Sequence, residues 1–243
     1  MKAPRLFLLP LVLLATACAG THGGSRREGV SSSLVEYLYP AGEKPPSQSG
    51  RFPNMQLPLN VGLAFVPAGS GQSQALSEVE RMMLLNEVKG SFTGRDFIAE
   101  IAVIPETFMR GGRGFTALDQ TAQLYGLDVM ALVSFDEVTH ATETTSSLRY
   151  WTIVGDTVIE GNKNDVRTFV ETAVFDVPTH KLLFRAPGSS ATMSNATLVD
   201  REKGMRVTQR QGFQRAMADM MTQLDKALDA FKERIRADGS KRD

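Results

Sequence analysis

The residue of this sequence whose type and position point most directly to chemistry is Cys18, the only cysteine in the chain. It follows a basic start with Lys2 and Arg5, an apolar run over residues 6–14 and the small residues 15–17. A cationic start, an apolar run of about 7 to 15 residues and small residues before a cleavage site are the features of a secretory signal. Because the chain has no second cysteine, a thiol in this position suits acylation and not a disulfide.

The segment that ends at Cys18 resembles the bacterial lipobox. The resemblance implies that Cys18 receives a diacylglycerol through its sulfur, that residues 1–17 are removed, and that the new amino terminus is acylated as well. Ala19 follows the cysteine, and similarity to lipoproteins that carry no aspartate there implies transfer to the outer membrane. An uncleaved membrane helix would need about 20 apolar residues, whereas Pro10 interrupts this run. Since two or more acyl chains hold a protein stably on a bilayer, Cys18 alone is sufficient as the lipid anchor.

The other reactive side chains do not form a recognisable motif. The histidines His22, His140 and His180 share no metal-ligand spacing. The best remaining group, Asp136 and Glu137 with His140, lacks a further ligand close in the sequence, so a solvated loop is favoured over a metal site. We therefore expect neither a metal nor a cofactor.

Two further segments lack the motifs of a nucleotide-binding site and of a serine hydrolase. The Arg-Gly-Gly-Arg-Gly turn at 110–114 lacks both the G-x-x-x-x-G-K-[ST] and the G-x-G-x-x-G spacing, so a flexible surface loop is favoured. Ser134 has no G-x-S-x-G elbow around it. Without residues 1–17 the chain has 25 basic and 27 acidic side chains and no basic stripe with interleaved aromatics, so nucleic acid is not an expected partner. These observations favour a protein that is not an enzyme.

Candidate contacts with a partner protein lie in three places. Leu34, Tyr37 and Tyr39 form an apolar cluster in a segment rich in Gly, Ser and Pro. Docking of this cluster on the chain's own domain is favoured over docking on a partner. His140 lies in a Thr- and Ser-rich loop after a buried strand, the usual place for contacts. Trp151, the only tryptophan, would be a recognition hot spot if exposed, although a core position is the more common case.

The elements that would position these residues begin near residue 57. Alternating apolar residues predict a strand over 57–67. A capping box of Ser77 and Glu80 then predicts a helix that ends at Gly90. The nearly continuous apolar run at 97–104 predicts a central strand buried on both faces. The buried face of the helix would consist of Val79, Met82, Met83, Leu85 and Val88.

A second helix is predicted over 116–125 with its C-cap at Gly126, followed by a strand over 128–135. An order of strand, helix, strand, helix, strand favours an α/β layer with a partly parallel sheet. In the second half, turn formers separate period-two strands over 148–159 and 166–177, and a tight turn at 178–181 leads from the second of these into residues 182–185. This pattern predicts antiparallel hairpins added to the same sheet.

The chain closes with a helix over 205–236, in which apolar residues recur every three or four positions. At 1.5 Å per residue it spans about 45 Å, so it either covers the sheet or extends past it to another subunit. The predicted fold class is α/β, with a mixed sheet of about five to six strands and this helix packed on it. The predicted organisation is a signal (1–17), an acylated flexible tether (18–55), one periplasmic domain (56–237) and a polar tail (238–243).

Over about residues 57–235 this order of elements resembles the periplasmic lipoproteins related to the curli secretion channel and to the amino-terminal domain of the Tol-Pal translocation protein. A narrower resemblance lies in Ser-Ser-Ser-Leu-Val-Glu-Tyr-Leu-Tyr-Pro at 31–40, which is similar to the rhombotarget lipoprotein family. That family is associated by name with the rhombosortase protein-sorting system of Gram-negative bacteria. The chain lacks the carboxy-terminal Gly-Gly, apolar helix and basic tail of a rhombosortase substrate, so the resemblance implies an accessory protein and not a cargo.

These features lead to three functional hypotheses. The first is a non-enzymatic adaptor or assembly factor, anchored in the outer membrane on the periplasmic side, that binds another envelope protein during sorting or secretion. The second is an oligomeric channel or scaffold like the curli secretion lipoprotein, although a spanning strand needs one continuously apolar face and 166–177 offers none. The third and least favoured is an envelope hydrolase with its site in the loop 136–147.

Overall fold

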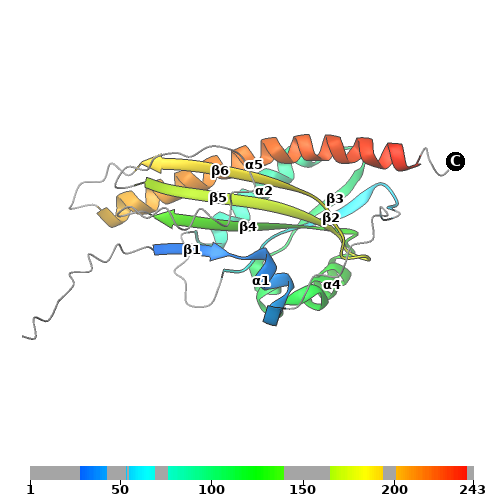
Figure 1. The fold of residues 1–243 in the computed structure, drawn as a ribbon, viewed down its shortest axis with the longest axis horizontal. Helices are drawn as coiled ribbons and strands as arrows, with labels where there is room; N and C mark the ends of the chain where they lie inside the picture. Colours follow the sequence, from blue (N-terminus) through cyan, green and yellow to red (C-terminus); the bar gives the residue numbers. More distant parts are fainter. Residues whose placement is uncertain are drawn as a thin grey trace, which may run out of the picture.

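The fold is an α/β layer built on one mixed sheet (Figure 1). The strands follow the order β3-β2-β4-β5-β6, with β1 paired to β4. Helices α2 and α5 cover one face of the sheet, and α1, α3 and α4 cover the other. This confirms the predicted fold class.

The computed structural model describes residues 28–42, 53, 55–68, 76–139, 165–193 and 201–239. The elements are β1 (Glu28–Ser32), α1 (Leu34–Leu38), the 3₁₀ turn η1 (Pro40–Gly42), β2 (Leu59–Phe65), α2 (Glu78–Phe92), β3 (Ile98–Val103), α3 (Glu106–Arg110), α4 (Gly114–Tyr125), β4 (Val129–Thr139), β5 (Asp165–Asp176), β6 (Leu182–Met193) and α5 (Arg201–Gly239).

The parallel part of the sheet consists of β2, β3 and β4. Strand β2 pairs in parallel with β3 on one side and with β4 on the other, as the predicted strand and helix order required. Strand β3, however, is an edge strand. The expectation of a central strand buried on both faces was therefore wrong: Glu100 is exposed, and Ile101 is the one fully buried residue of β3.

Strand β4 is longer than predicted because two different strands share one of its edges. Residues 129–133 pair in parallel with β2, and residues 135–139 pair antiparallel with β1. At the change of partner, the Ser32 hydroxyl accepts a hydrogen bond from the amide of Phe135 at 2.9 Å. The other edge of β4 pairs with β5 along its whole length. The extra partner explains why the strand continues to Thr139 and does not stop at Phe135.

Residues 28–42, which the sequence assigned to the tether, form β1, α1 and η1 on the domain. Ser33 caps α1, because its hydroxyl accepts the amide of Glu36 at 3.2 Å. Tyr37 and Leu38 are buried in the cluster between α1, α4 and the sheet. The apolar segment thus docks on the chain's own domain.

Helix α2 begins at the predicted capping box and ends later than predicted. The amide of Ser77 donates to Oε2 of Glu80 at 2.8 Å, and the Ser77 hydroxyl accepts the amide of Glu80 at 3.3 Å. The predicted end at Gly90 was wrong, because the helix continues to Phe92, whose ring is buried in the core.

The predicted buried face of α2 was also partly wrong. Val79 and Met83 are 68% and 66% exposed. Arg81 is buried instead, because its guanidinium bonds the carbonyl oxygen of Leu76 at 2.7 Å and the carboxylate of Glu106 at 2.5 Å. A charged residue can take a core position when its partners are buried with it, which periodicity alone does not reveal.

Helix α4 starts two residues earlier than predicted, and Gly126 ends it in the left-handed conformation (φ 65°), as expected. Leu118 and Ala122 are buried. Helix α3 was not predicted. It leads into the glycine-rich turn, and its last residue Arg110 bonds Glu106 one turn earlier at 2.9 Å.

In the second half of the chain, β5 and β6 form the predicted antiparallel hairpin. The strand predicted over 148–159 lies outside the described residues.

Helix α5 covers β5 and β6, the first of the two alternatives considered for it. It lies very close to the strands: a Cβ at Gly188 would be 2.3 Å from the carbonyl oxygen of Ala216, and one at Gly212 would be 2.7 Å from Oγ1 of Thr168.

Gly188→Val should destabilise the domain, because its side chain would meet backbone atoms of α5. Overpacking of this kind typically costs about 1–3 kcal/mol. The control Gly90→Ala adds a methyl group into open space inside α2, so it should raise stability by up to about 1 kcal/mol. Urea unfolding of the purified proteins, followed by circular dichroism, measures both. Equal changes in the two variants would contradict the close contact.

Candidate apolar binding pocket

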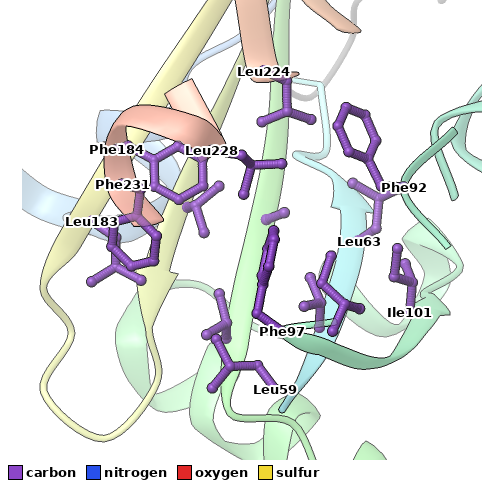
Figure 2. A pocket seen from close by; sticks show the side chains of 15 residues that line it. Leu59, Leu63, Phe92, Phe97, Ile101, Leu183, Phe184, Leu224, Leu228 and Phe231 are labelled. Atoms are coloured by element: carbon purple, nitrogen blue, oxygen red, sulfur yellow. The ribbon is translucent and has the colours of Figure 1, made fainter. Parts of the chain in front are cut away.

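An apolar pocket lies between α2, α5 and the sheet (Figure 2). Helix α2 ends at Phe92, whereas α5 continues along the sheet to Gly239. A helix is about 10 Å wide and strands are about 4.8 Å apart, so one helix covers roughly two strands. Because α5 lies over β5 and β6, the starts of β2 and β3 have no helix above them once α2 has ended.

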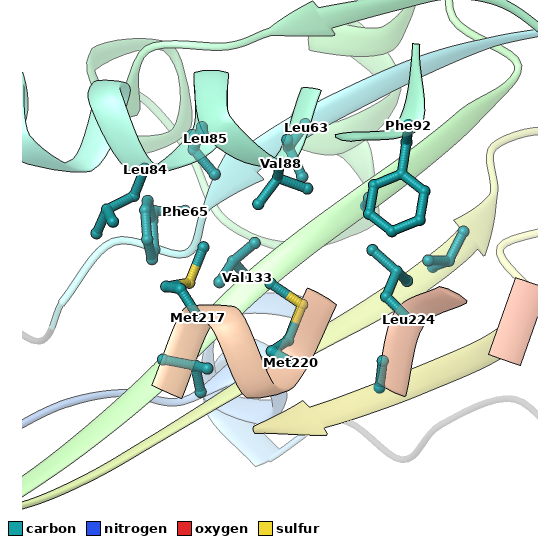
Figure 3. Packing of buried hydrophobic residues seen from close by; sticks show 14 of the residues in the cluster. Leu63, Phe65, Leu84, Leu85, Val88, Phe92, Val133, Met217, Met220 and Leu224 are labelled. Atoms are coloured by element: carbon teal, nitrogen blue, oxygen red, sulfur yellow. The ribbon is translucent and has the colours of Figure 1, made fainter. Parts of the chain in front are cut away.

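The two helices close the core where both are present (Figure 3). There, apolar side chains of α2 and α5 meet over β2 and β4. The contributing residues include Leu84, Leu85 and Val88 of α2, Met217 and Met220 of α5, and Phe65 and Val133 of the strands. The pocket is therefore the open end of the same apolar layer.

The lining of the pocket consists entirely of apolar side chains, fifteen in all. About 600 Å³ of space, part of it open to solvent, is free of protein atoms. The cavity itself has a volume of about 70 Å³, well below the range of about 300–1,000 Å³ that is usual for small-molecule sites. The first residues of the three parallel strands, Leu59, Ile98 and Val129, all contribute. The pocket thus lies at the amino ends of these strands, whereas open parallel sheets usually bind ligands at the carboxyl ends.

Helix α5 supplies one wall through Leu224, Leu228 and Phe231. Their spacing of four and three residues places them on one side of the helix. The ring of Phe231 lies 5.0 Å, between centroids, from that of Phe184 on β6. The apolar stripe of the C-terminal helix was the sequence signal for this wall. The helix predicted from the capping box ended before Phe92, so this residue was not assigned to the wall of the pocket. The pocket opens because α2 is shorter than α5, and no sequence pattern indicates this.

Two cationic side chains lie against rings that line the pocket. The guanidinium of Arg95 lies 5.5 Å from the ring centroid of Phe92 and forms an ion pair with Asp225. The ammonium of Lys232 lies 5.7 Å from the ring centroid of Phe97. Cations at this distance are attracted by the face of an aromatic ring.

Hydrocarbon walls supply no acid, base, nucleophile or metal ligand, so the pocket can bind but offers no groups for catalysis. Within the described ranges there is no group of three or more His, Cys, Asp or Glu side chains placed to hold a metal ion. In the same part of the chain, no helix is both long enough and apolar enough to cross a bilayer.

The residues predicted to contact a partner do not line this pocket. Leu34, Tyr37 and Tyr39 lie on the opposite face of the sheet, where Tyr39 makes an edge contact with Phe115 at 5.5 Å between ring centroids. Tyr37 is 4% exposed, and burial raises the pKa of its hydroxyl to about 12. The structure therefore buries Tyr37 in the chain's own core and packs the half-buried Leu34 and Tyr39 against it.

The remaining predicted site residues, Cys18, His140 and Trp151, lie outside the described residues. His22 does so as well. His180 is described: its Nε2 lies 2.8 Å from Oδ1 of Asp119, on the α4 side of the sheet and away from the pocket.

Glu137 was expected in a solvated loop, and that expectation was wrong. It belongs to β4, is 2% exposed and faces α5, where Nε2 of Gln209 donates to its Oε1 at 2.6 Å. Its Oε2 has no hydrogen-bond partner among the described residues, and the same holds for the hydroxyls of Thr168 and Thr192 beneath α5. Burial raises the pKa of Glu137 to about 7, against the lowering effect of the Gln209 hydrogen bond. The extension of β4 along β1 is what carries this carboxyl into the interior.

Neither a protein-family profile nor a curated protein matches this chain in sequence. Among solved structures, a Xanthomonas campestris protein of family DUF330 is similar with a TM-score of 0.35 and 11% identity, over 73% of this chain and 93% of that one. A PelC dodecamer from Paraburkholderia phytofirmans is similar with a TM-score of 0.29 and 8% identity, over 65% of this chain and 95% of that one. At TM-scores this low, neither neighbour carries an argument about this chain.

Glu137→Gln should remove a pH-dependent penalty on stability. Below about pH 4.5 both states of the wild type hold the proton, so the penalty is absent. Between about pH 4.5 and pH 7 the unfolded state releases its proton while the folded state keeps it, which costs up to about 3 kcal/mol. Glutamine keeps an oxygen for the Gln209 amide and does not titrate. Urea unfolding should therefore show the variant to be more stable than wild type at pH 8 and similar to it at pH 4. A difference independent of pH would refute this.

Proposed function

We propose that this chain is a lipid-anchored envelope protein that binds its ligand or partner without converting it, as an adaptor or assembly factor. The observation that carries the proposal is the pocket whose walls consist only of hydrocarbon. Such a surface offers binding energy in proportion to the apolar area that a ligand covers and no group for acid–base or nucleophilic catalysis. The anchor is the acylated Cys18 that the signal-like segment predicts.

The arrangement of the sheet suits a protein held at its amino terminus. Glu28 of β1 lies opposite Thr139 at the far end of β4, whereas Val129 at the near end lines the pocket. Ten residues of strand separate the two ends, about 33 Å. In Figure 1, β1 lies at the left and the C-terminal part of α5 at the right. The pocket is thus distant from the end at which the N-terminal strand joins the sheet, and membrane anchoring there would leave it accessible.

The alternative role, an oligomeric channel or scaffold, has less support from the strands. The outer edge of β6 is the place where another copy could extend the sheet, but Pro187 removes one donor there. The amide of Ser189 donates to Asp219 of α5 at 2.9 Å and is not available either. Both faces of β5 are also occupied, since Val174 and Phe175 belong to the clusters on opposite sides of the sheet. These features favour the adaptor.

The pathway follows from the resemblance of residues 31–40 to the rhombotarget lipoproteins. On that basis the protein serves envelope protein sorting or secretion as an accessory of the rhombosortase system, at the periplasmic face of the outer membrane. Tyr37 and Leu38 of this segment are buried against the sheet. In this role the segment helps to fix the N-terminal strand to the domain, and the partner contacts lie elsewhere.

Cys18→Ala should abolish covalent incorporation of an alkyne-tagged fatty acid, because Cys18 is the only thiol in the chain. In-gel fluorescence of the denatured protein measures this. The matched variant Ala19→Asp keeps the thiol, so labelling should persist while the protein moves from the outer-membrane to the inner-membrane fraction of a density gradient. Labelling that survives in Cys18→Ala would refute the anchor.

Mild crosslinking in cells, followed by gentle extraction in detergent, should yield one copy of this chain bound to a different envelope protein. The native mass gives the copy number, and mass spectrometry identifies the co-purified chain. A ring of many identical copies would contradict the adaptor and favour the scaffold.

A further inference from the structure

We propose that residues 204–212, near the start of helix α5, form a pH-sensitive latch, which lies on the sheet while Glu137 is protonated and detaches from it when Glu137 ionises. We call these residues the latch segment. The inference goes beyond the proposed binding role and does not rest on it, because Glu137 and the pocket lie towards opposite ends of β4.

Helix α5 changes its mode of contact with the sheet at Phe213. From Phe213 onward the helix supplies apolar side chains to the core, and the Phe213 ring lies 5.3 Å, between centroids, from that of Phe135 on β4. Within the latch segment, none of the side chains that the structure describes belongs to this core. The segment can therefore leave the sheet without opening the apolar layer, and Phe213 marks the place where the movement would stop.

Polar contacts attach the latch segment to the strands. Nε2 of Gln209 donates to Oε1 of Glu137 at 2.6 Å. The Ser190 hydroxyl of β6 donates to the carbonyl oxygen of Gly212 at 2.7 Å. Each such bond contributes little net stability, because water replaces it when the two groups separate. The cost of burying one charge is therefore enough to decide whether the segment stays attached.

The strands beneath the latch segment carry oxygen atoms that need water or a proton. Oε2 of Glu137 and the hydroxyls of Thr168 and Thr192 are buried without a hydrogen-bond partner among the described residues. A Cβ at Gly212 would lie 2.7 Å from Oγ1 of Thr168 and 3.0 Å from that of Thr192, so the helix backbone lies directly against these hydroxyls. Detachment would let water reach all three oxygens, which favours the open form once Glu137 is charged.

The strands next to Glu137 do not compensate its charge. Burial raises the pKa of Glu137 to about 7, and Asp136, the preceding residue on β4, raises it further. The charged residue of β1 is Glu28, another anion, two positions from the residue opposite Glu137. On β5, Arg167 is one position from the residue opposite Glu137, so its side chain lies on the other face of the sheet.

The helix provides a hydrogen bond but no close cation among its described side chains. The bond from Gln209 lowers the pKa of Glu137, against the larger effect of burial. Arg206 is exposed to solvent. Arg210 is exposed as well, and its Nε lies 2.5 Å from Oε1 of Glu80 on α2. Ionised Glu137 thus has one donor in the closed form and is fully hydrated only when the latch segment detaches.

The test is hydrogen–deuterium exchange of the full-length chain in detergent, measured by mass spectrometry between pH 5 and pH 8. Exchange is expressed as protection factors, which remove the intrinsic effect of pH on the amides. The protection of residues 204–212 should fall at least about tenfold over this range, because the carboxyl exposed by opening ionises at its ordinary, lower pKa. Residues 213–235 should keep their protection, since local opening need not spread through the core.

Three variants identify the titrating group. Glu137→Gln keeps an oxygen for the Gln209 amide and should make the protection of the latch segment independent of pH. Glu171→Gln is the matched control: burial also raises the pKa of Glu171, but this residue lies on the other face of the sheet, 3.4 Å from Arg185, so the pH dependence should persist. Gln209→Leu removes the bond that lowers the pKa of Glu137, so protection should continue to fall up to a higher pH than in the wild type.

Protection of residues 204–212 that is the same at pH 5 and pH 8 would overturn the inference. Protection that falls equally in residues 213–235 would do so as well, because the opening would then be global. PH dependence that survives in Glu137→Gln, or that disappears in Glu171→Gln, would assign the titration to another group. An unshifted profile in Gln209→Leu would show that the contact between α5 and Glu137 does not control the latch.

Discussion

The contact between α5 and the β5–β6 hairpin is the interaction on which the rest of the structure depends. It is possible because Gly188 and Gly212 let the helix backbone approach the strands more closely than any other residue would. Met217 and Met220 then reach the neighbouring strands and join the core that α2 completes on the same face of the sheet. Since β6 is an edge strand, this helix also protects the hairpin, and Asp219 binds an edge amide that would otherwise be open.

The same contact explains the pocket. A helix held tightly over β5 and β6 cannot also cover β2 and β3, and α2 covers them only as far as Phe92. The apolar side chains beyond that point face each other across free space. The unfilled space forfeits dispersion contacts. An apolar group that fills the pocket would recover these contacts and stabilise the domain.

At the other end of the sheet the layer beneath α5 becomes polar. Glu137, Thr168 and Thr192 are buried there, and each has an oxygen without a hydrogen-bond partner among the described residues. Interiors of this kind are costly unless a proton or an ordered water satisfies them. The raised pKa of Glu137 expresses this cost, because the carboxyl is easier to bury when it is protonated. Helix α5 thus covers the apolar pocket at one end of the sheet and the buried titratable carboxyl group of Glu137 at the other.

The features that depend on residues close together in the chain could be predicted from the amino-acid sequence. These are the capping box at Ser77, the left-handed C-cap at Gly126, the β5–β6 hairpin and the apolar stripe of α5. Each follows from local hydrogen bonding or from periodicity. Other features emerge only when distant segments pack together: β3 lies at an edge, Arg81 and Glu137 are buried, and a pocket opens beyond Phe92. These depend on which distant element lies beside a residue, and one strand or helix pattern is compatible with several such neighbours.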